Sequence, residues 1–169
     1  LEPKYKKNGK LPLDEILELM DDKTVKLVVF SNPNNPLGTL TPILDVEKIL
    51  KKAKAKNIDV LHDEAYFEFS KTTAKSLIEK YDNLYIIRTF SKAFGLVAAR
   101  AGYVISKENN IQELLKIRGP YDVNMFAKIA VISALKDKKY ADDYIKKVME
   151  TSKPKFENFL HKKGICFYP

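Results

Sequence analysis

Short apolar runs alternate with helical patterns through the first half of the chain, and this alternation restricts the fold more than any other feature. The runs are VKLVVF, NIDVL and LYIIRT, and TPILDVEKILKKAKAKN and TTAKSLIEKY lie between them. TPILDVEKILKKAKAKN places its apolar residues on one helical face, whereas the runs are short and rich in β-branched residues. Strands that alternate with helices form a mainly parallel sheet, so the sequence predicts an α/β fold.

The remaining segments extend this prediction. LPLDEILELM has the apolar spacing of a helix, and Thr41 is the predicted N-cap of the helix that follows the first strand, with Pro42 at its first position. RAGYVIS is a predicted fourth strand, and it follows the third too closely for a long crossover, which fits an antiparallel direction. From residue 107 onward the pattern is helical, and Pro154 is expected to kink or break the last helix.

The net charge of +8 leaves two interpretations open. Such a charge can indicate binding to nucleic acid or to an anionic surface, but no recognition motif is present. We interpret the lysines as solvating helix faces, and we predict no nucleic-acid partner, no membrane partner and no metal site. The longest apolar runs are too short to span a bilayer. The single cysteine, Cys166, permits no internal disulfide and indicates a reducing compartment, so we expect a cytoplasmic location.

Polar loops follow the first three predicted strands: SNPNNPLG, HDEAYFEF and TFSKAFG. In parallel sheets such loops meet at the carboxyl edge, where ligands bind. Each loop also has a structural explanation, as a turn, a helix cap or an exposed Ser-Lys pair. Together, however, the loops supply an amide, a carboxylate, a phenol, hydroxyls, a lysine and an arginine. An aromatic aldehyde cofactor that carries a phosphate needs this set of groups.

The motifs NPNNPLG, DEAYFEF and RTFSKAFGLVAARAGY resemble those of the fold-type I aminotransferases, which use pyridoxal 5′-phosphate. With IRGPYDVN added, the chain most resembles the histidinol-phosphate aminotransferases, from about residue 11 to residue 169. The resemblance implies that residues 1–118 form part of the mainly parallel α/β/α sheet of the large, cofactor-binding domain. Residues 119–169 would then form connecting helices and the start of the small C-terminal domain.

The resemblance also assigns roles to seven residues: Asn35, Asp63, Tyr66, Thr89, Ser91, Lys92 and Arg100. Lys92 is the catalytic residue and forms the Schiff base, and we expect it to be partly buried. Asp63 pairs with the pyridine nitrogen, while Asn35 and Tyr66 hydrogen-bond the ring oxygen. Thr89, Ser91 and Arg100 hold the phosphate, for which arginine offers a planar fork that always carries charge.

Three further residues receive no role from the resemblance: His62, Arg88 and Arg118. Because side chains alternate along a strand, His62 is expected on the opposite face from Asp63. We interpret Arg88 as structural, facing either solvent or a neighbouring helix.

The implied activity is transfer of an amino group between histidinol phosphate and 2-oxoglutarate or glutamate, in histidine biosynthesis. Its partners are a small-molecule amino donor and a 2-oxo acid, and the full-length enzyme is expected to be a homodimer. The chain lacks counterparts of the family's glycine-rich loop, its ring-stacking aromatic and its C-terminal arginine. We therefore expect a central fragment that is inactive alone.

Two alternatives stay open. One is another fold-type I enzyme, such as an aromatic aminotransferase or a threonine-phosphate decarboxylase. The other is a non-catalytic basic binding module, which an exposed Lys92 far from Asp63 would favour.

Overall fold

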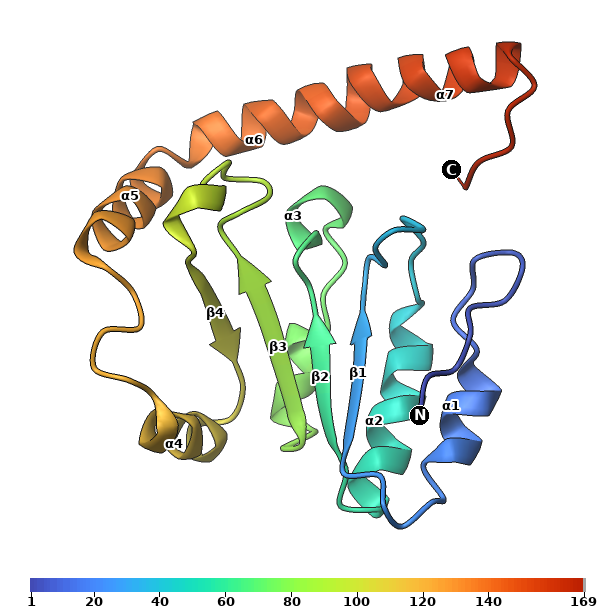
Figure 1. The fold of residues 1–169 in the computed structure, drawn as a ribbon, viewed down its shortest axis with the longest axis vertical. Coiled ribbons are helices and arrows are strands. Elements are labelled where there is room, and N and C mark those ends of the chain that lie inside the picture. The colour runs from blue at the N-terminus through green and yellow to red at the C-terminus, as the bar shows by residue number, and fades with distance from the viewer. Residues whose placement is uncertain (169) are drawn as a thin grey trace.

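The computed structural model describes residues 1–168, and its centre is a four-stranded sheet (Figure 1). The elements follow in this order: α1 (Leu13–Leu19), β1 (Leu27–Ser31), α2 (Ile43–Ala55), β2 (Asp59–Asp63), α3 (Phe67–Ser70), the 3₁₀ helix η1 (Lys75–Glu79), β3 (Leu84–Thr89), the 3₁₀ helix η2 (Val97–Ala99), β4 (Gly102–Ile105), α4 (Glu108–Ile117), α5 (Met125–Lys136), α6 (Lys138–Lys147), the π-helical turn η3 (Val148–Ser152) and α7 (Lys153–Lys162).

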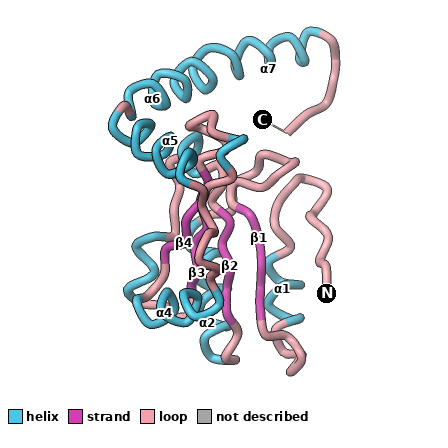
Figure 2. The backbone as a smooth tube through the Cα atoms, turned by 60° about the vertical axis from the view of Figure 1, so that its left-hand side comes forward, coloured by secondary structure: helices cyan, strands magenta, loops and turns pink. Residues whose placement is uncertain are grey.

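The sheet has the order β1-β2-β3-β4, with β1, β2 and β3 parallel and β4 antiparallel to β3. This topology confirms the predicted mainly parallel α/β fold and the direction of the fourth strand. Ser31 pairs with Asp63, so β1 and β2 end level with each other. The continuous rod of α6, η3 and α7 lies beyond this carboxyl edge in both views (Figures 1 and 2).

The core lies between one face of the sheet and the helices α1, α2 and η1. Helix α2 presents a stripe of side chains that are wholly buried: Val46, Ile49, Leu50 and Ala53. Their spacing places them on one face, and burying a side chain of the size of Ile49 or Leu50 contributes about 1.5–3 kcal/mol. The other sheet face is open at β1, where Leu27 is 53% and Val29 57% exposed. Within residues 1–168, helices therefore cover mainly one face of the sheet.

Two local predictions have different outcomes, and the one at Thr41 is wrong. Thr41 is not an N-cap, because α2 begins at Ile43 after Pro42 and no side chain caps it. The backbone N–H and carbonyl of Thr41 are instead bonded to the buried side chain of Asn32. Pro154 was expected to kink or break the last helix, and the α-helix is interrupted directly before it: α6 ends at Lys147, and Pro154 lies in the first turn of α7, where its missing N–H is tolerated. The disruption takes the form of the π-helical turn that precedes it.

No helix formed by residues 1–168 is both long enough and apolar enough to cross a membrane. The proposed division of the chain at residue 118 falls between α4 and α5, and it stays a prediction.

Candidate functional site

Tyr66 is the point at which the loops after β1, β2 and β3 meet. Its hydroxyl accepts a hydrogen bond of 2.9 Å from the Nδ2 amide of Asn35, which belongs to the loop after β1. The amine of Lys92, in the loop after β3, lies 5.4 Å from the centre of the Tyr66 ring. The parallel strands thus bring the predicted amide, phenol and lysine together at one edge of the sheet.

Asp63 ends β2 and is half-buried. Its backbone carbonyl accepts from the N–H of Asn32, which extends the pairing with β1 by one residue. Its Oδ1 atom accepts from the N–H of Ala65 at 2.8 Å, which fixes the side chain across the turn. Its second oxygen accepts no hydrogen bond from residues 1–168, so one carboxylate oxygen stays available to a ligand.

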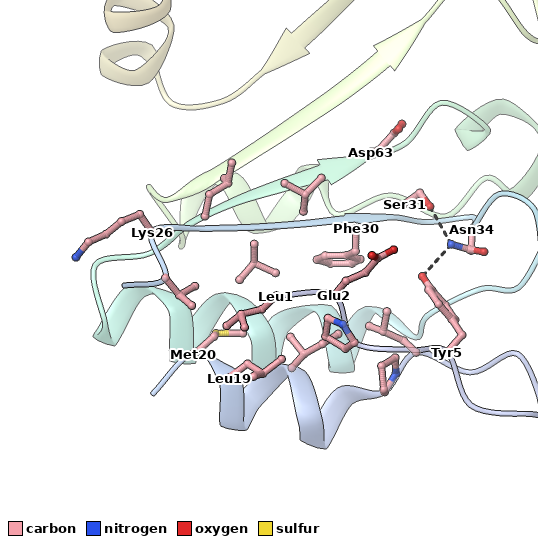
Figure 3. A pocket seen from close by; sticks show the side chains of 18 of the residues that line it. Leu1, Glu2, Tyr5, Leu19, Met20, Lys26, Phe30, Ser31, Asn34 and Asp63 are labelled. Carbon is pink, nitrogen blue, oxygen red and sulfur yellow. Dashed lines mark hydrogen bonds between the residues drawn. The ribbon is translucent and has the colours of Figure 1, made fainter. Parts of the chain in front are cut away.

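Asp63 also lies at one end of a mostly apolar groove of about 700 Å³ along β1 (Figure 3). Ser31 and Asn34 line the same end, and Asn34 donates hydrogen bonds to Ser31 and to the hydroxyl of Tyr5. Lys92 does not line this groove. The groove therefore touches the candidate site only through its polar end.

Thr89 and Ser91 form a local anchor in the loop after β3. The Thr89 hydroxyl oxygen accepts from the N–H of Ser91 at 3.1 Å, and it lies 3.4 Å from the carbonyl oxygen of Ala101. Gly95 has a φ of 68°, which glycine adopts readily, and it allows the loop to fold back toward the sheet. The Thr89 hydroxyl, predicted to hold a phosphate, is thus fixed against the backbone of Ser91.

Arg100 is separate from this anchor. It has a left-handed backbone conformation, and its guanidinium donates a hydrogen bond to the carbonyl of Val97 at 3.1 Å. The side chain is exposed, and no hydrogen bond joins it to Thr89 or Ser91 among the described residues. The structure brings together six of the seven predicted residues at the carboxyl edge, while the Arg100 side chain turns back on its own loop.

Lys92 is exposed, so the expectation that it is partly buried is wrong. The exposure alone would suit the binding module, but that alternative also requires Lys92 to be far from Asp63. The Lys92 amine lies 5.4 Å from the ring of Tyr66, three residues after Asp63, which argues against the alternative.

Glu64 and Arg88 form a buried ion pair that the sequence did not reveal. The guanidinium donates to Oε2 of Glu64 from Nε at 2.9 Å and from Nη2 at 2.7 Å, and it lies 3.6 Å over the ring of Phe67. Its side chain is 8% exposed, so the possibility that Arg88 faces solvent is excluded. The only signal for this arginine in the sequence was its position: Arg88 and Arg100, two of the chain's three arginines, lie on either side of the segment after β3.

The carboxylate of Glu64 is wholly buried and satisfied on both oxygens. Oε1 accepts from the N–H of Ala74 at 2.7 Å, and Oε2 also accepts from the hydroxyl of Thr73 at 2.9 Å. Burial alone would raise the pKa of Glu64, but His62, the Ala74 N–H and Arg88 together hold this pKa below its usual value. Glu64 is therefore a carboxylate at neutral pH.

His62 lies in the core, as strand alternation predicts. It is wholly buried, its ring centre is 4.8 Å from that of Phe30, and its Nδ1 atom lies 3.3 Å from Oε1 of Glu64. Its neighbour Asp63 instead lines the groove. His62 belongs to the packing beneath the site and does not reach the ligand side.

The groups at the carboxyl edge fit a phosphorylated pyridine aldehyde. Lys92 supplies an accessible amine, Asp63 a free carboxylate oxygen, and Asn35 with Tyr66 a paired amide and phenol. Thr89 and Ser91 supply hydroxyls beside a backbone turn. This donor set is the one that pyridoxal phosphate requires.

Residues 2–160 match the family model described as aminotransferase class I and II. The chain is 37% identical over 154 residues to a dihydroxyacetone phosphate transaminase of Campylobacter jejuni, with 91% of this chain and 41% of that protein covered. It is 38% identical over 140 residues to a histidinol-phosphate aminotransferase of Clostridium novyi, with 83% of this chain and 38% of that protein covered.

Among solved structures, the histidinol-phosphate aminotransferase of Sinorhizobium meliloti in complex with pyridoxal-5′-phosphate aligns with a TM-score of 0.75 at 30% identity. That alignment covers 89% of this chain and 41% of the solved chain. The chain thus spans about two fifths of the length of these relatives. The match to the family model covers almost the whole chain, and we conclude that it belongs to the aminotransferase class I and II family, which depends on pyridoxal phosphate.

Proposed function

We propose that this chain carries the cofactor-linking lysine of an enzyme that moves an amino group between histidinol phosphate and 2-oxoglutarate or glutamate. The observation that carries the proposal is the meeting of three loops at Tyr66, whose hydroxyl accepts a hydrogen bond of 2.9 Å from Asn35 and whose ring centre lies 5.4 Å from the Lys92 amine. The choice of substrate is supported by the names of the Clostridium novyi and Sinorhizobium meliloti relatives.

When bound, pyridoxal phosphate supplies an aldehyde for a lysine amine and a ring that withdraws electrons from the substrate carbon. Lys92 would provide that amine, and the same amine would hold or move the proton at the substrate carbon. Asp63 keeps a proton on the pyridine nitrogen, and Asn35 with Tyr66 orients the ring through its oxygen. Ser91 and Thr89 anchor the phosphate.

Arg100 joins the phosphate anchor in this proposal by leaving its hydrogen bond to the Val97 carbonyl. A guanidinium binds phosphate with two parallel hydrogen bonds, which outweigh one bond to a neutral carbonyl. The exposure of the side chain leaves it free to make that turn.

We further propose that the 169 residues do not transaminate alone. Relatives of this family are more than twice as long as the aligned region, and we expect the additional sequence to complete the substrate site and a homodimer interface. Positioning of reacting groups can account for roughly 7–11 kcal/mol of a barrier, so an incomplete site loses most of its rate. We place the enzyme in histidine biosynthesis on the relatives' names, and in the cytoplasm because this chain contains a single thiol, Cys166.

A second candidate substrate is dihydroxyacetone phosphate, because the Campylobacter jejuni relative, 37% identical, carries that name. Both candidates are phosphate monoesters. A direct comparison of the two with the full-length enzyme, using glutamate and 2-oxoglutarate as the other pair, separates them. We expect turnover with histidinol phosphate, and turnover with dihydroxyacetone phosphate alone would transfer the proposal to the second candidate.

The covalent role of Lys92 can be tested on the chain itself. We expect incubation with pyridoxal phosphate, borohydride reduction and peptide mapping to label Lys92. The Lys92→Ala variant should lose this label, and the control variant Lys48→Ala, which removes an exposed ion pair with Asp45, should keep it. A label on other lysines alone would refute the assignment of Lys92.

A further inference from the structure

We propose that Glu64 is a positioning residue, which fixes the turn from Asp63 to Tyr66 against the end of β3. The proposal rests on the proposed function, since it concerns how the cofactor-facing side chains are placed. Glu64 follows Asp63 directly, but its side chain points the other way and is wholly buried. It is thus close enough to control the site without contacting a ligand.

The ion pair joins the loop after β2 to the end of β3. Arg88 is the residue before Thr89 in β3, and its fork holds Oε2 of Glu64 at 2.7 and 2.9 Å. The backbone N–H of Glu64 also donates to the carbonyl of Ile87 at 2.9 Å, one step beyond the last paired residue of β2. The start of the loop after β2, at Asp63 and Glu64, is therefore held to the strand that leads to Ser91 and Lys92.

The same guanidinium also holds the other end of the turn. It lies 3.6 Å over the ring of Phe67, and Phe67 directly follows Tyr66. A guanidinium over an aromatic face is attracted by the ring's negative face, more strongly where water is excluded. Arg88 thus contacts the turn at Glu64 and at Phe67, with Tyr66 between the two contacts.

The segment after α3 supplies the remaining bonds. Thr73 donates its hydroxyl to Glu64 and accepts from Arg88 at 2.7 Å, and Ala74 donates its N–H to the other carboxylate oxygen. The loop from residue 63 to residue 74 is therefore closed onto one buried carboxylate. Removal of this carboxylate breaks its bonds to Thr73, Ala74 and Arg88, so that only backbone bonds hold the start of the loop.

Stability alone does not account for this arrangement. Burying a charge pair has a large desolvation cost, and replacing such a pair by apolar groups of similar volume is often neutral or stabilising. A carboxylate shared by three segments does, however, impose directions on all of them, and a binding site needs its groups held to within about 0.5 Å. A positioning role therefore predicts that site geometry and stability respond differently to substitution.

The test compares Glu64→Gln, the double variant Glu64→Gln with Arg88→Met, and Glu79→Gln as a control that removes an exposed ion pair with Lys107. Two quantities are measured on the 169-residue chain. One is amide hydrogen exchange of residues 63–70, relative to that of α2, and the other is the pyridoxal phosphate concentration that half-saturates borohydride-trapped label at Lys92.

We expect Glu64→Gln to increase amide hydrogen exchange of residues 63–70 at least tenfold. We also expect it to raise the half-saturating concentration of pyridoxal phosphate at least tenfold, whereas Glu79→Gln should change neither quantity. The double variant contains no buried charge from this pair, so its thermal midpoint should return to near the original value while both shifts persist. If the double variant regained the original exchange and labelling as well as the original stability, the positioning role would be overturned. Unchanged exchange in Glu64→Gln would also overturn it. If the unsubstituted chain takes up no label at Lys92, the proposed function fails, while the exchange measurement still decides the role of Glu64.

Discussion

Asn32 holds both ends of the loop that carries Asn35, and its removal should be costly. Its wholly buried side chain donates from Nδ2 to the carbonyl of Thr41 at 3.0 Å and accepts at Oδ1 from the Thr41 N–H at 2.9 Å. The two bonds close residues 32–41, the loop between β1 and α2. Substitution of Asn32 by alanine removes both bonds and leaves the rest of the chain unchanged.

The expected loss follows from the two groups left behind. Thr41 is 7% exposed, so its N–H and its carbonyl would both be buried without a partner. Each such group costs about 1–3 kcal/mol, which gives a total loss of about 2–6 kcal/mol. Water that enters the vacated space brings the loss toward the lower end. With a urea slope of about 2 kcal/mol per molar, a loss of about 3 kcal/mol lowers the unfolding midpoint by about 1.5 M.

The assay is urea unfolding of Asn32→Ala beside Asn8→Ala. Asn8 also accepts one backbone hydrogen bond, from Lys10 at 3.1 Å, but in an exposed turn, and we expect its loss to stay within about 0.5 kcal/mol. In Asn32→Ala we also expect weaker cofactor labelling at Lys92, because the loop that carries Asn35 is loosened. A loss below about 1 kcal/mol with an unchanged urea slope would refute the reasoning from unpaired groups.

Three further variants test separate parts of the structure. Burial raises the pKa of Glu68, whose Oε2 has no partner among residues 1–168, so its ionised form destabilises the fold as the pH rises above about 4.5. Glu68→Gln should therefore raise the melting temperature by a few degrees at pH 8 and less at pH 4, and equal shifts would contradict this. Gly102→Ala places a Cβ atom 2.7 Å from the Arg88 carbonyl oxygen, so urea unfolding should show a loss of about 1–3 kcal/mol, and no loss would exclude the close contact. Tyr66→Phe removes the acceptor of the Asn35 bond, and we expect less Lys92 label at limiting cofactor with under about 1 kcal/mol of stability lost. Undiminished label would exclude a role for the hydroxyl.

The fold could be predicted because its determinants are local in the sequence. The period of apolar residues distinguished strands from helices, and the length of each connection indicated whether the next strand was parallel. The N-cap prediction failed because the backbone groups of Thr41 bond to Asn32, nine residues earlier, and no local pattern shows that partner. At Pro154 the sequence indicated where the helix is disrupted but not how, because a π-helical turn from Val148 to Ser152 separates α6 from α7.

The candidate site was predictable as far as strand ends determine it. Asn35, Tyr66 and Lys92 follow different strands, and the rule that parallel strands share a carboxyl edge predicts that they lie together. The direction of a long side chain at that edge is a different matter. Arg100 turns to the carbonyl of Val97 and Lys92 reaches solvent, because a loop conformation and the surrounding cover set these directions.

The adjacent acids Asp63 and Glu64 show how far strand periodicity carries an argument. Alternation places two neighbouring side chains on opposite faces, so one acid had to face the core. Periodicity cannot identify its partner, because the partner depends on the register between β2 and β3. The register pairs Asp63 with Ile87, and one step further along it places Glu64 beside Arg88. Asp63 keeps one carboxylate oxygen free for a ligand, whereas both oxygens of Glu64 accept hydrogen bonds. The side chain of Glu64 is longer than that of Asp63, and it is the one that spans the distance to Arg88 on the next strand.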